Sequence, residues 1–554
     1  MRQSSKIRST LIFVIFLSLY FILVINLYFI QVLQTNFFSA LGNRQYQIEI
    51  TNYPVRGEIL DRYGLQVALN RETLSAFVLP KQIKDLKKLN LFLKQHFPIG
   101  FERLKKSGDK HFIYIARRLS NDLCQQLGCD QVVDLKFMQE PSRYYPSDSM
   151  GPVIGITNID NHGIFGLEQM YDTTLAGKPT KMFLEKDARN ANYYFKCNSQ
   201  TNGSLGANLS LTIDTDLQAM AYEELAKSVD QLEAELGAVV IMDAQNGEIL
   251  SLVSYPGFDP NSTTQVLDQT KTRLTPVVDS YEYGSIMKVF VALAALDEGV
   301  VQQDELIDCE NKIETSIDGM RFTTTKSSVN GEIPFSEVVA RSNNIGMVKV
   351  AKRLNEKLYN HYIKLGFGSK TGLNFLGEQS GYLAHPSKWS KRSIISLSFG
   401  YEISATLLQV ARAFCLIANG GYLVTPKLVL DQDLAKPFVP DLGKPIYDSQ
   451  TVQIVQNILR NTVQHGTGVR AKICGYDVMG KTGTANLAMN GSYSKDHLIF
   501  TFAGIVQKGN YNRVIVTCIK NVKNAYKKYG ANTAAPLFEK IAEKMLVHDK
   551  VVID

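Results

Sequence analysis

The chain has little that would hold a metal ion. Its seven cysteines lack the paired spacing of zinc or iron–sulfur sites, and its eight histidines form no H-E-x-x-H or similar cluster. We therefore expect no catalytic metal and no cofactor. Cys124 and Cys129 are near enough in sequence for a local bridge, although buried thiols are slightly favoured. The odd count leaves at least one thiol unpaired among Cys124, Cys129, Cys197, Cys309, Cys415, Cys474 and Cys518.

Long runs of one charge, internal repeats and low-complexity segments are also missing. The net charge of +7 is modest for 554 residues, so nucleic acid is not an expected partner. This excess can hold a domain near anionic lipid or an anionic wall polymer, but ordinary surface charge is the simpler interpretation. With 45% hydrophobic and 20% charged residues, the chain is large enough for a membrane anchor and two or more globular domains.

One long hydrophobic run is present, the uncharged stretch LIFVIFLSLYFILVINLYFI from Leu11 to Ile30. Its length suits a helix crossing a hydrocarbon core of roughly 30 Å. The run is longer than the apolar part of a signal peptide and no small-x-small cleavage site follows it, which favours an uncleaved anchor over residues 11–33. The basic residues Arg2, Lys6 and Arg8 place the tail, residues 1–10, in the cytoplasm and everything after the anchor outside.

The remainder divides at the Gly/Asn/Ser-rich stretch TNGSLGAN, Thr201 to Asn208. Residues 34–205 show short alternating apolar segments and predict a small, extended α+β module. In residues 206–554, strand-like segments occur near both sequence ends with helical segments between them. This order predicts a central antiparallel sheet covered by helices, and hence an α+β fold class for the whole chain.

The stretch GYDVMGKTGTA, Gly475 to Ala485, fits two unrelated motifs. It matches the nucleotide-binding P-loop and also contains the K-T-G of penicillin-interacting serine enzymes. A P-loop should follow a buried strand and open a helix, whereas here a turn-like segment, Asn486 to Lys495, leads into the strand-like run LIFTFAGIV. A nucleotide site is also unexpected outside the membrane. The K-T-G interpretation therefore prevails, and it requires a serine nucleophile elsewhere.

A candidate nucleophile occurs in EYGSIMKVFVALAALDEGV, where Ser285 and Lys288 form an S-x-x-K at the start of an apolar helix. Residues three apart share a helix face, so the Lys288 amine can approach the Ser285 hydroxyl and take its proton. Each short motif alone is weak because the chain contains chance copies of all three. These copies are Ser492 to Lys495, Ser328 to Asn330, and Lys370 to Gly372.

The order of the three motifs along the chain and the local structure expected around each make their combination more specific than any one motif alone. Ser285 and Lys288 come first, Ser342-Asn343-Asn344 follows at a helix entry, and Lys481-Thr482-Gly483 precedes a strand. In this order the chain resembles the penicillin-binding proteins over nearly its whole length, and flanking matches include HGTGVRA and GKTGTA. Arg56 to Gly64 resembles the R-G-x-I-x-D-R-x-G signature of the pedestal domain in the monofunctional class B. RYYPSDSMGPVIGITNIDNHGIFGLEQMYDTTLAG, from Arg143, is similar to the septal, cell-division branch.

The resemblance implies a peptidoglycan D,D-transpeptidase. Ser285 would attack the carbonyl between the terminal D-alanines of a stem peptide and pass the acyl group to a neighbouring amine. Lys288 would be the base, with its pKa lowered by burial and by nearby Lys481. Other roles implied by the resemblance are proton relay by Ser342, substrate binding by Asn344, carboxylate binding by Lys481 and Thr482, close strand approach at Gly483, and an oxyanion hole from the N–H groups of Ser285 and Thr484.

Two residues depart from the family pattern. Tyr283 stands where proline is usual before Gly-Ser, and Glu402 stands where glycine is usual in F-G-Y-G. The resemblance implies β-lactams as covalent inhibitors and a lipid II polymerase of the SEDS family and other division proteins as partners. Rival functions are an elongation-specific class B transpeptidase, a D,D-carboxypeptidase, a β-lactamase and a mainly non-catalytic division scaffold.

Overall fold

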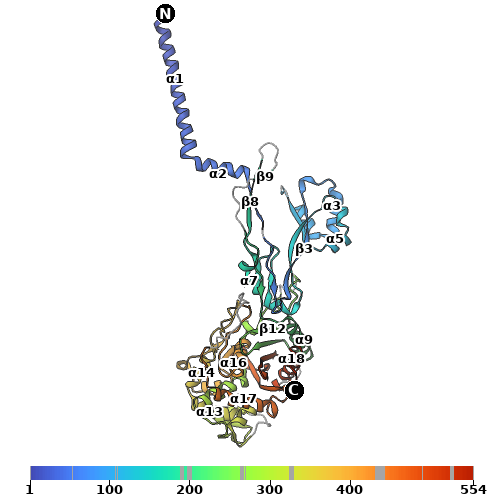
Figure 1. Cartoon of the computed structure of the whole chain (residues 1–554), viewed down its shortest axis with the longest axis vertical. Helices are drawn as coiled ribbons and strands as arrows, with labels where there is room; N and C mark the ends of the chain where they lie inside the picture. The colour runs from blue at the N-terminus through green and yellow to red at the C-terminus, as the bar shows by residue number, and fades with distance from the viewer. Residues whose placement is uncertain are drawn as a thin grey trace. The chain divides into compact units, whose positions relative to one another are not determined.

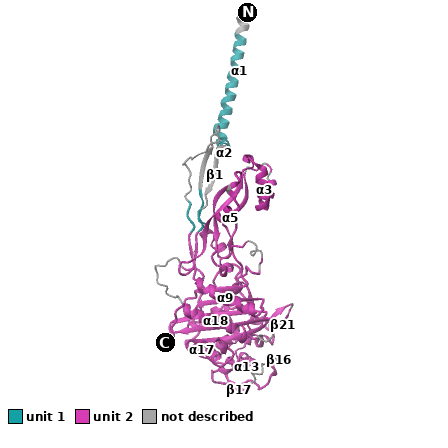
Figure 2. Cartoon of the chain, turned by 90° about the vertical axis from the view of Figure 1, so that its right-hand side faces the viewer, with its two compact units in different colours: residues 1–56, 176–206 teal, residues 57–175, 207–554 magenta. Residues whose placement is uncertain are grey.

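A computed structural model describes most of the chain and divides it into two compact units, residues 1–56 with 176–206 and residues 57–175 with 207–554 (Figure 2). Of the features named above, Cys197, Thr201, Asn202, Ser328, Val329 and Asn490 lie outside the described residues. The described residues are 2–52, 54–106, 108, 110, 112–186, 193–195, 203–262, 268, 270–317, 319–323, 330–430, 443–489, 491–523 and 529–552.

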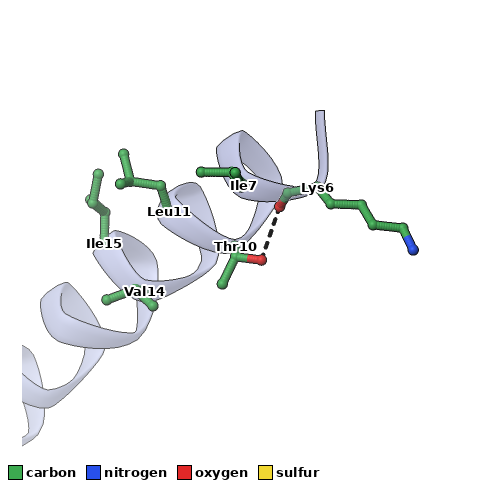
Figure 3. Close-up of a pocket in the computed structure, with 6 residues that line it drawn as sticks. All are labelled: Lys6, Ile7, Thr10, Leu11, Val14 and Ile15. Atoms are coloured by element: carbon green, nitrogen blue, oxygen red, sulfur yellow. Dashed lines mark hydrogen bonds between the residues drawn. The ribbon is translucent and has the colours of Figure 1, made fainter. Parts of the chain in front are cut away.

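The first unit begins with one long apolar helix. Helix α1 (Arg2–Tyr28) continues into a π-helical turn, η1 (Phe29–Leu33) (Figure 1). The most apolar 18-residue window within Lys6–Leu33 has a mean hydropathy of 2.6, which fits a single-pass membrane anchor. The Thr10 hydroxyl donates to the Lys6 carbonyl at 2.9 Å, so this polar group is satisfied within the helix (Figure 3). Ile7, Leu11, Val14 and Ile15 flank it with apolar side chains only.

Beyond the anchor, the first unit contains helix α2 (Thr35–Tyr46) and a small antiparallel sheet. Strand β1 (Gln47–Asn52) pairs with β8 (Thr180–Lys186), and β8 pairs with β9 (Tyr193–Phe195). Two segments separated by more than a hundred residues therefore build this sheet together.

The second unit starts with a five-stranded sheet, in which β3 (Gln66–Val78) pairs with β2 (Ile59–Leu60), β4 (Ile113–Leu119) and β5 (Lys136–Tyr144). The fifth strand, β10 (Leu209–Ser210), pairs with β2. Helix α3 (Leu86–His96) buries Leu89 and Leu93 in a small core with residues of β3 and β4. Cys124 and Cys129 are both buried in the same core.

The R-G-x-I-x-D-R-x-G signature ties this small sheet to the larger fold that follows. One carboxylate oxygen of Asp61 accepts the N–H groups of Tyr63 and Leu65 at 2.8 and 2.9 Å, and the other accepts the Thr215 hydroxyl at 2.9 Å. Thr215 is the first residue of helix α9 (Thr215–Gln231), whose N-cap is Asp214.

A fully buried ion pair lies close to the same signature. The Arg143 guanidinium donates to the Glu168 carboxylate at 2.7 Å and to the Gly57 carbonyl at 2.8 Å, and both charged side chains are 0% exposed. Because a buried charge without its partner is costly, the pair fixes strand β5 against helix α7 (Gly166–Met170). The bond to the Gly57 carbonyl holds β5 to the signature.

A five-stranded antiparallel sheet in the order β12-β11-β22-β21-β20 forms the centre of the larger fold. Its strands are β11 (Leu236–Asp243), β12 (Ile249–Tyr255), β20 (Asp477–Met489), β21 (Ser492–Lys508) and β22 (Tyr511–Lys520). The sheet joins strands from near both ends of residues 206–554, as the sequence predicts, and the α+β fold class is confirmed.

Both faces of this sheet are covered by helices, because successive strand residues point to opposite sides. Val239 and Ile241 of β11 share one core with helices α9 and α18 (Ala534–His548), which Figure 2 shows across the sheet. Ala238 and Val240 share the other core with helices α11 (Lys288–Asp297) and α16 (Leu407–Ala418). This explains the nearly continuous apolar sequence of β11.

The hairpin after the K-T-G differs from the expectation. The sequence predicts turn-like structure from Asn486 to Lys495, but β20 continues to Met489 and β21 already begins at Ser492. Met489 pairs directly with Ser492. In the sequence these two residues are separated by Asn-Gly, a dipeptide typical of two-residue hairpins. Pairing across the hairpin thus overrides the weak strand propensity of its polar residues.

Candidate active site

Ser285 lies in a 3-10 turn, η6 (Gly284–Ile286), directly ahead of α11 rather than inside its first turn. This turn packs against β20, the strand that carries Lys481-Thr482-Gly483. A Cβ at Gly284 would lie 2.6 Å from the Thr484 carbonyl oxygen, and Gly284 has a φ of +55°. Glycine before the serine is therefore required by both space and backbone conformation. The Ser285 side chain remains partly exposed at the edge of the sheet.

Gly483 allows the same close approach from the strand side. A Cβ there would lie 2.6 Å from the Tyr283 carbonyl oxygen and 2.7 Å from Cγ1 of Ile286. Any larger residue would push the K-T-G strand away from the turn that carries Ser285. Thr484 follows, and its Oγ1 accepts the N–H of Gly530 at 3.1 Å, which holds this part of the strand to a second loop.

Lys288, the lysine of the S-x-x-K motif, contacts the S-x-N motif at Ser342 and Asn344. Its Nζ contacts the Ser342 carbonyl oxygen at 2.7 Å, the Ser342 Oγ at 3.1 Å and the Asn344 Oδ1 at 2.5 Å. A neutral amine has two N–H groups and one lone pair, so it can donate to the carbonyl and the amide oxygen and accept from the Ser342 hydroxyl. The uncharged form of Lys288 can therefore satisfy all three partners.

A strained backbone presents Ser342. Its φ is +60°, in the left-handed region that a serine rarely occupies. The adjacent Asn343 caps helix α13 (Asn344–Leu354), because its side chain accepts the N–H of Gly346 at 2.9 Å. The cap and the left-handed residue together turn the Ser342 carbonyl, the Ser342 hydroxyl and the Asn344 amide toward one amine.

The third motif adds a second buried lysine and a residue that the motifs do not contain. Lys481 Nζ lies 3.4 Å from Thr467 Oγ1 and 3.2 Å from the Thr482 carbonyl oxygen. The hydroxyl of Thr482 donates to Thr467 Oγ1 at 2.9 Å. Thr467 was not among the predicted site residues, although it lies in the HGTGVRA stretch that supported the family resemblance. That flanking match was the signal available for it.

Burial governs the charge of both lysines, which are 0% exposed. Burial lowers the pKa of Lys481 to about 7. Burial, followed by repulsion from Lys481, holds the pKa of Lys288 well below its ordinary value. Both causes are those expected from the sequence. An amine that is neutral near pH 7 can accept a proton from a nearby hydroxyl.

The two departures from the family pattern meet near Ser285. Tyr283 is 2% exposed with a φ of −101°, and its carbonyl oxygen is the one that approaches Gly483. Glu402 has a φ of +59°, the left-handed conformation that glycine adopts without strain. Keeping a glutamate there costs about 1–2 kcal/mol in backbone energy. Its N–H donates to the Glu282 carboxylate at 2.8 Å.

The chance copies of the motifs occupy structural positions. Thr371 of the second K-T-G is buried, and its hydroxyl donates to Glu378 at 2.5 Å, while Lys370 is exposed. Ser492 and Lys495 of the second S-x-x-K are exposed near the start of β21. Lys370 and Lys495 are exposed, whereas Lys288 and Lys481 are buried, and this difference separates the two copies from the candidate site.

Comparison with known proteins finds two family domains in the chain. Residues 237–543 match the family described as penicillin binding protein transpeptidase domain, and residues 51–211 match the penicillin-binding protein dimerisation domain. The chain is 32% identical to "Probable peptidoglycan D,D-transpeptidase PenA" of Neisseria meningitidis over 91% of this chain and 86% of that protein.

Two further similarities cover most of the chain. It is 29% identical to "Peptidoglycan D,D-transpeptidase FtsI" of Escherichia coli K12 over 87% of this chain and 82% of that protein. Its fold is similar to the crystal structure of penicillin binding protein 3 from Mycobacterium tuberculosis complexed with aztreonam. The TM-score is 0.68 and the identity 24%, covering 91% of this chain and 98% of the other.

Proposed function

From the premise that this chain belongs to the class B penicillin-binding proteins and is a peptidoglycan D,D-transpeptidase, we propose that Ser285 is its nucleophile. The observation that carries the proposal is the meeting of three sequence-distant motifs at one strand edge. The Ser285 turn packs on the K-T-G strand, and Lys288 contacts Ser342 and Asn344.

Lys288 is the general base in this mechanism. The neutral amine takes the Ser285 hydroxyl proton as Oγ attacks the carbonyl between the two terminal D-alanines. The carbon–nitrogen bond then breaks, and the proton returns to the leaving amine through Ser342, whose Oγ lies 3.1 Å from Lys288 Nζ. D-Alanine leaves, and the acyl group remains on Ser285. In the second half, the acceptor amine attacks this ester, loses a proton to Lys288, and Ser285 regains its hydroxyl.

The remaining residues bind the substrate. Thr482 and Thr467 offer adjacent hydroxyls beside Lys481, a group of donors suited to the terminal carboxylate of the stem peptide. A bound carboxylate would favour the charged form of Lys481, because it places a negative charge beside the amine. Asn344 binds the peptide backbone, and the N–H groups of Ser285 and Thr484 form the oxyanion hole.

We propose a single-pass membrane topology for the chain. In the proposed topology, residues 1–10 are cytoplasmic, residues 11–33 cross the bacterial inner membrane, and the pedestal (34–205) and transpeptidase domain (206–554) lie outside. Three basic residues in the tail support this orientation. The similarity to the division protein FtsI supports a septal role, with a SEDS-family lipid II polymerase and other division proteins as partners. Peptidoglycan stem peptides are the substrates, and β-lactams acylate the same serine.

The test is covalent labelling of the membrane-expressed chain with a fluorescent penicillin. We expect wild type to take up label that persists for hours, and Ser285→Ala to take up none. Ser492→Ala, in the exposed chance motif, is the matched control and should label like wild type. Label on Ser285→Ala would refute the assignment of the nucleophile. Loss of label within minutes would move the activity toward a hydrolase, either a D,D-carboxypeptidase or a β-lactamase.

A folded wild type that takes up no label and forms no cross-links from stem peptides would favour the division scaffold. The location of the protein in the cell distinguishes a septal role from an elongation role, because a septal enzyme should concentrate at the division site. The scaffold outcome does not rest on penicillin labelling alone, because the stem-peptide assay measures the release of D-alanine directly.

A further inference from the structure

Glu282 lies three residues before Ser285 and holds two distant segments. Its Oε1 accepts the backbone N–H of Glu402 at 2.8 Å and the hydroxyl of Tyr493 at 3.0 Å. Glu402 follows helix α15 (Ser393–Ser398) in the chain, and Tyr493 lies at the start of β21, in the hairpin after the K-T-G. One carboxylate oxygen thus joins the nucleophile segment, the loop at 399–402 and the β20–β21 hairpin.

The same three segments touch at further points. The N–H of Asn486 donates to the Tyr401 hydroxyl at 3.1 Å, and the rings of Tyr401 and Tyr493 meet edge to face at 4.9 Å. A Cβ at Gly400 would lie 2.1 Å from the carbonyl oxygen of Gly284, the residue directly before Ser285. The loop therefore presses against the backbone of the nucleophile turn, and a small displacement of the loop would move that turn.

Two features of this junction reduce the stability of the fold, which is unexpected for a purely structural contact. Glu402 is held in a left-handed conformation, and the second carboxylate oxygen of Glu282 is buried without a hydrogen-bond partner among the described residues. An orphaned buried acceptor and a strained residue each reduce stability. Such features persist where the surrounding structure holds them in place, and they cluster at functional sites.

The carboxylate also borders a cavity of about 570 Å³ behind the end of β20. Glu235, the other acid lining it, is bonded to Lys520 and Asn521 and makes no hydrogen bond in the described structure to the loop at 399–402 or to Tyr493. The cavity therefore contains two acids with different partners, and only Glu282 joins the segments around the nucleophile.

We propose that Glu282 is a positioning residue that fixes the Ser285 turn by fastening the loop at 399–402 and the β20–β21 hairpin to it. The inference rests on the proposed role of Ser285. Its acting atom is the acceptor Oε1, since that atom alone makes both bonds. An amide in place of the carboxylate keeps this acceptor, whereas an alanine removes it.

The test compares the rate of Ser285 acylation by a fluorescent penicillin among variants of the full chain. Glu282→Ala should lower the acylation step about 10- to 100-fold, the size expected when a reacting group is displaced by up to about 1 Å. Tyr493→Phe removes one of the two bonds and should lower it less. Glu282→Gln should recover most of the lost rate. Glu235→Ala, in the same cavity, is the matched control and should acylate like wild type.

Saturation kinetics separate positioning from general loosening of the fold. Glu282→Ala should lower the rate constant of the acylation step while leaving the dissociation constant of the non-covalent penicillin complex nearly unchanged. An unchanged acylation constant would overturn the proposal. So would a Glu282→Gln variant as slow as Glu282→Ala, because charge rather than the acceptor would then be responsible.

A second measurement does not depend on Ser285 chemistry. Amide hydrogen exchange at Glu402 and along the hairpin should speed up in Glu282→Ala and stay unchanged in Glu235→Ala. If wild type takes up no penicillin, the proposed nucleophile fails, and this measurement still tests whether Glu282 fastens the three segments. Unchanged exchange at Glu402 in Glu282→Ala would refute the fastening itself.

Discussion

The buried Lys481 should make the protein less stable at low pH, and replacing it should reverse this. Burial lowers its pKa from 10.5 to about 7, which corresponds to about 5 kcal/mol removed from the charged form. In the unfolded chain the lysine keeps its proton up to its ordinary pKa, whereas the folded chain releases it near pH 7. The unfolded state therefore binds more protons between these values, and the free energy of unfolding rises with pH across that window.

Lys481→Met removes the titrating group without opening a large cavity. At pH 6 the wild-type chain carries nearly the full penalty, so the variant should be more stable by about 3–5 kcal/mol. At pH 9 about 2 kcal/mol of the penalty remains, and the advantage should shrink accordingly. The same variant should lose penicillin acylation, because Lys481 lies beside the carboxylate-binding hydroxyls. Greater stability with lost activity is the trade-off expected of a functional site.

The chain offers a good probe and a good control for this measurement. Its one tryptophan, Trp389, packs against the larger core and donates to the Ala384 carbonyl at 2.9 Å, so tryptophan fluorescence reports unfolding of this part of the chain. Lys370→Met, at the exposed lysine of the second K-T-G, is the matched control and should change stability little at either pH. A Lys481→Met variant that is no more stable at pH 6, or whose difference from wild type is independent of pH, would refute the reasoning.

Two other substitutions test the same structure. Lys288→Gln should lower the acylation rate of Ser285 by about 10²- to 10⁴-fold, the usual contribution of a general base, while Trp389 fluorescence shows a folded chain; acylation at the wild-type rate would exclude Lys288 as the base. Arg143→Met should destabilise the chain by about 3–5 kcal/mol because it leaves Glu168 buried without its cation. Limited proteolysis of the full chain, followed by the cleavage rate within residues 57–175, measures this loss of stability. The double variant Arg143→Met with Glu168→Leu should regain much of the lost stability. Equal cleavage rates in wild type and Arg143→Met would contradict the expected destabilisation.

Much of the candidate site could be predicted from the chain because its chemistry is written in short motifs. Lys288 three residues after Ser285, an S-x-N at a helix entry and a K-T-G before a strand carry their own local geometry. The P-loop interpretation was excluded because a strand-like run, rather than a helix, follows the K-T-G. Thr467 was not assigned because a single threonine in a glycine-rich turn has no chemistry of its own. It becomes part of the site only when the fold places its hydroxyl 2.9 Å from Thr482.

The structure alone decided how these pieces meet. The linear sequence determined the membrane anchor, the strands of the central sheet and the three motifs, since these depend on hydrophobic pattern and local spacing. It could not show that the hairpin after the K-T-G extends to Met489, because that depends on pairing with β21. Nor could it show that Glu282, Glu402 and Tyr493 share one hydrogen-bonded junction, since contacts between residues 120 or more positions apart arise only when the chain packs.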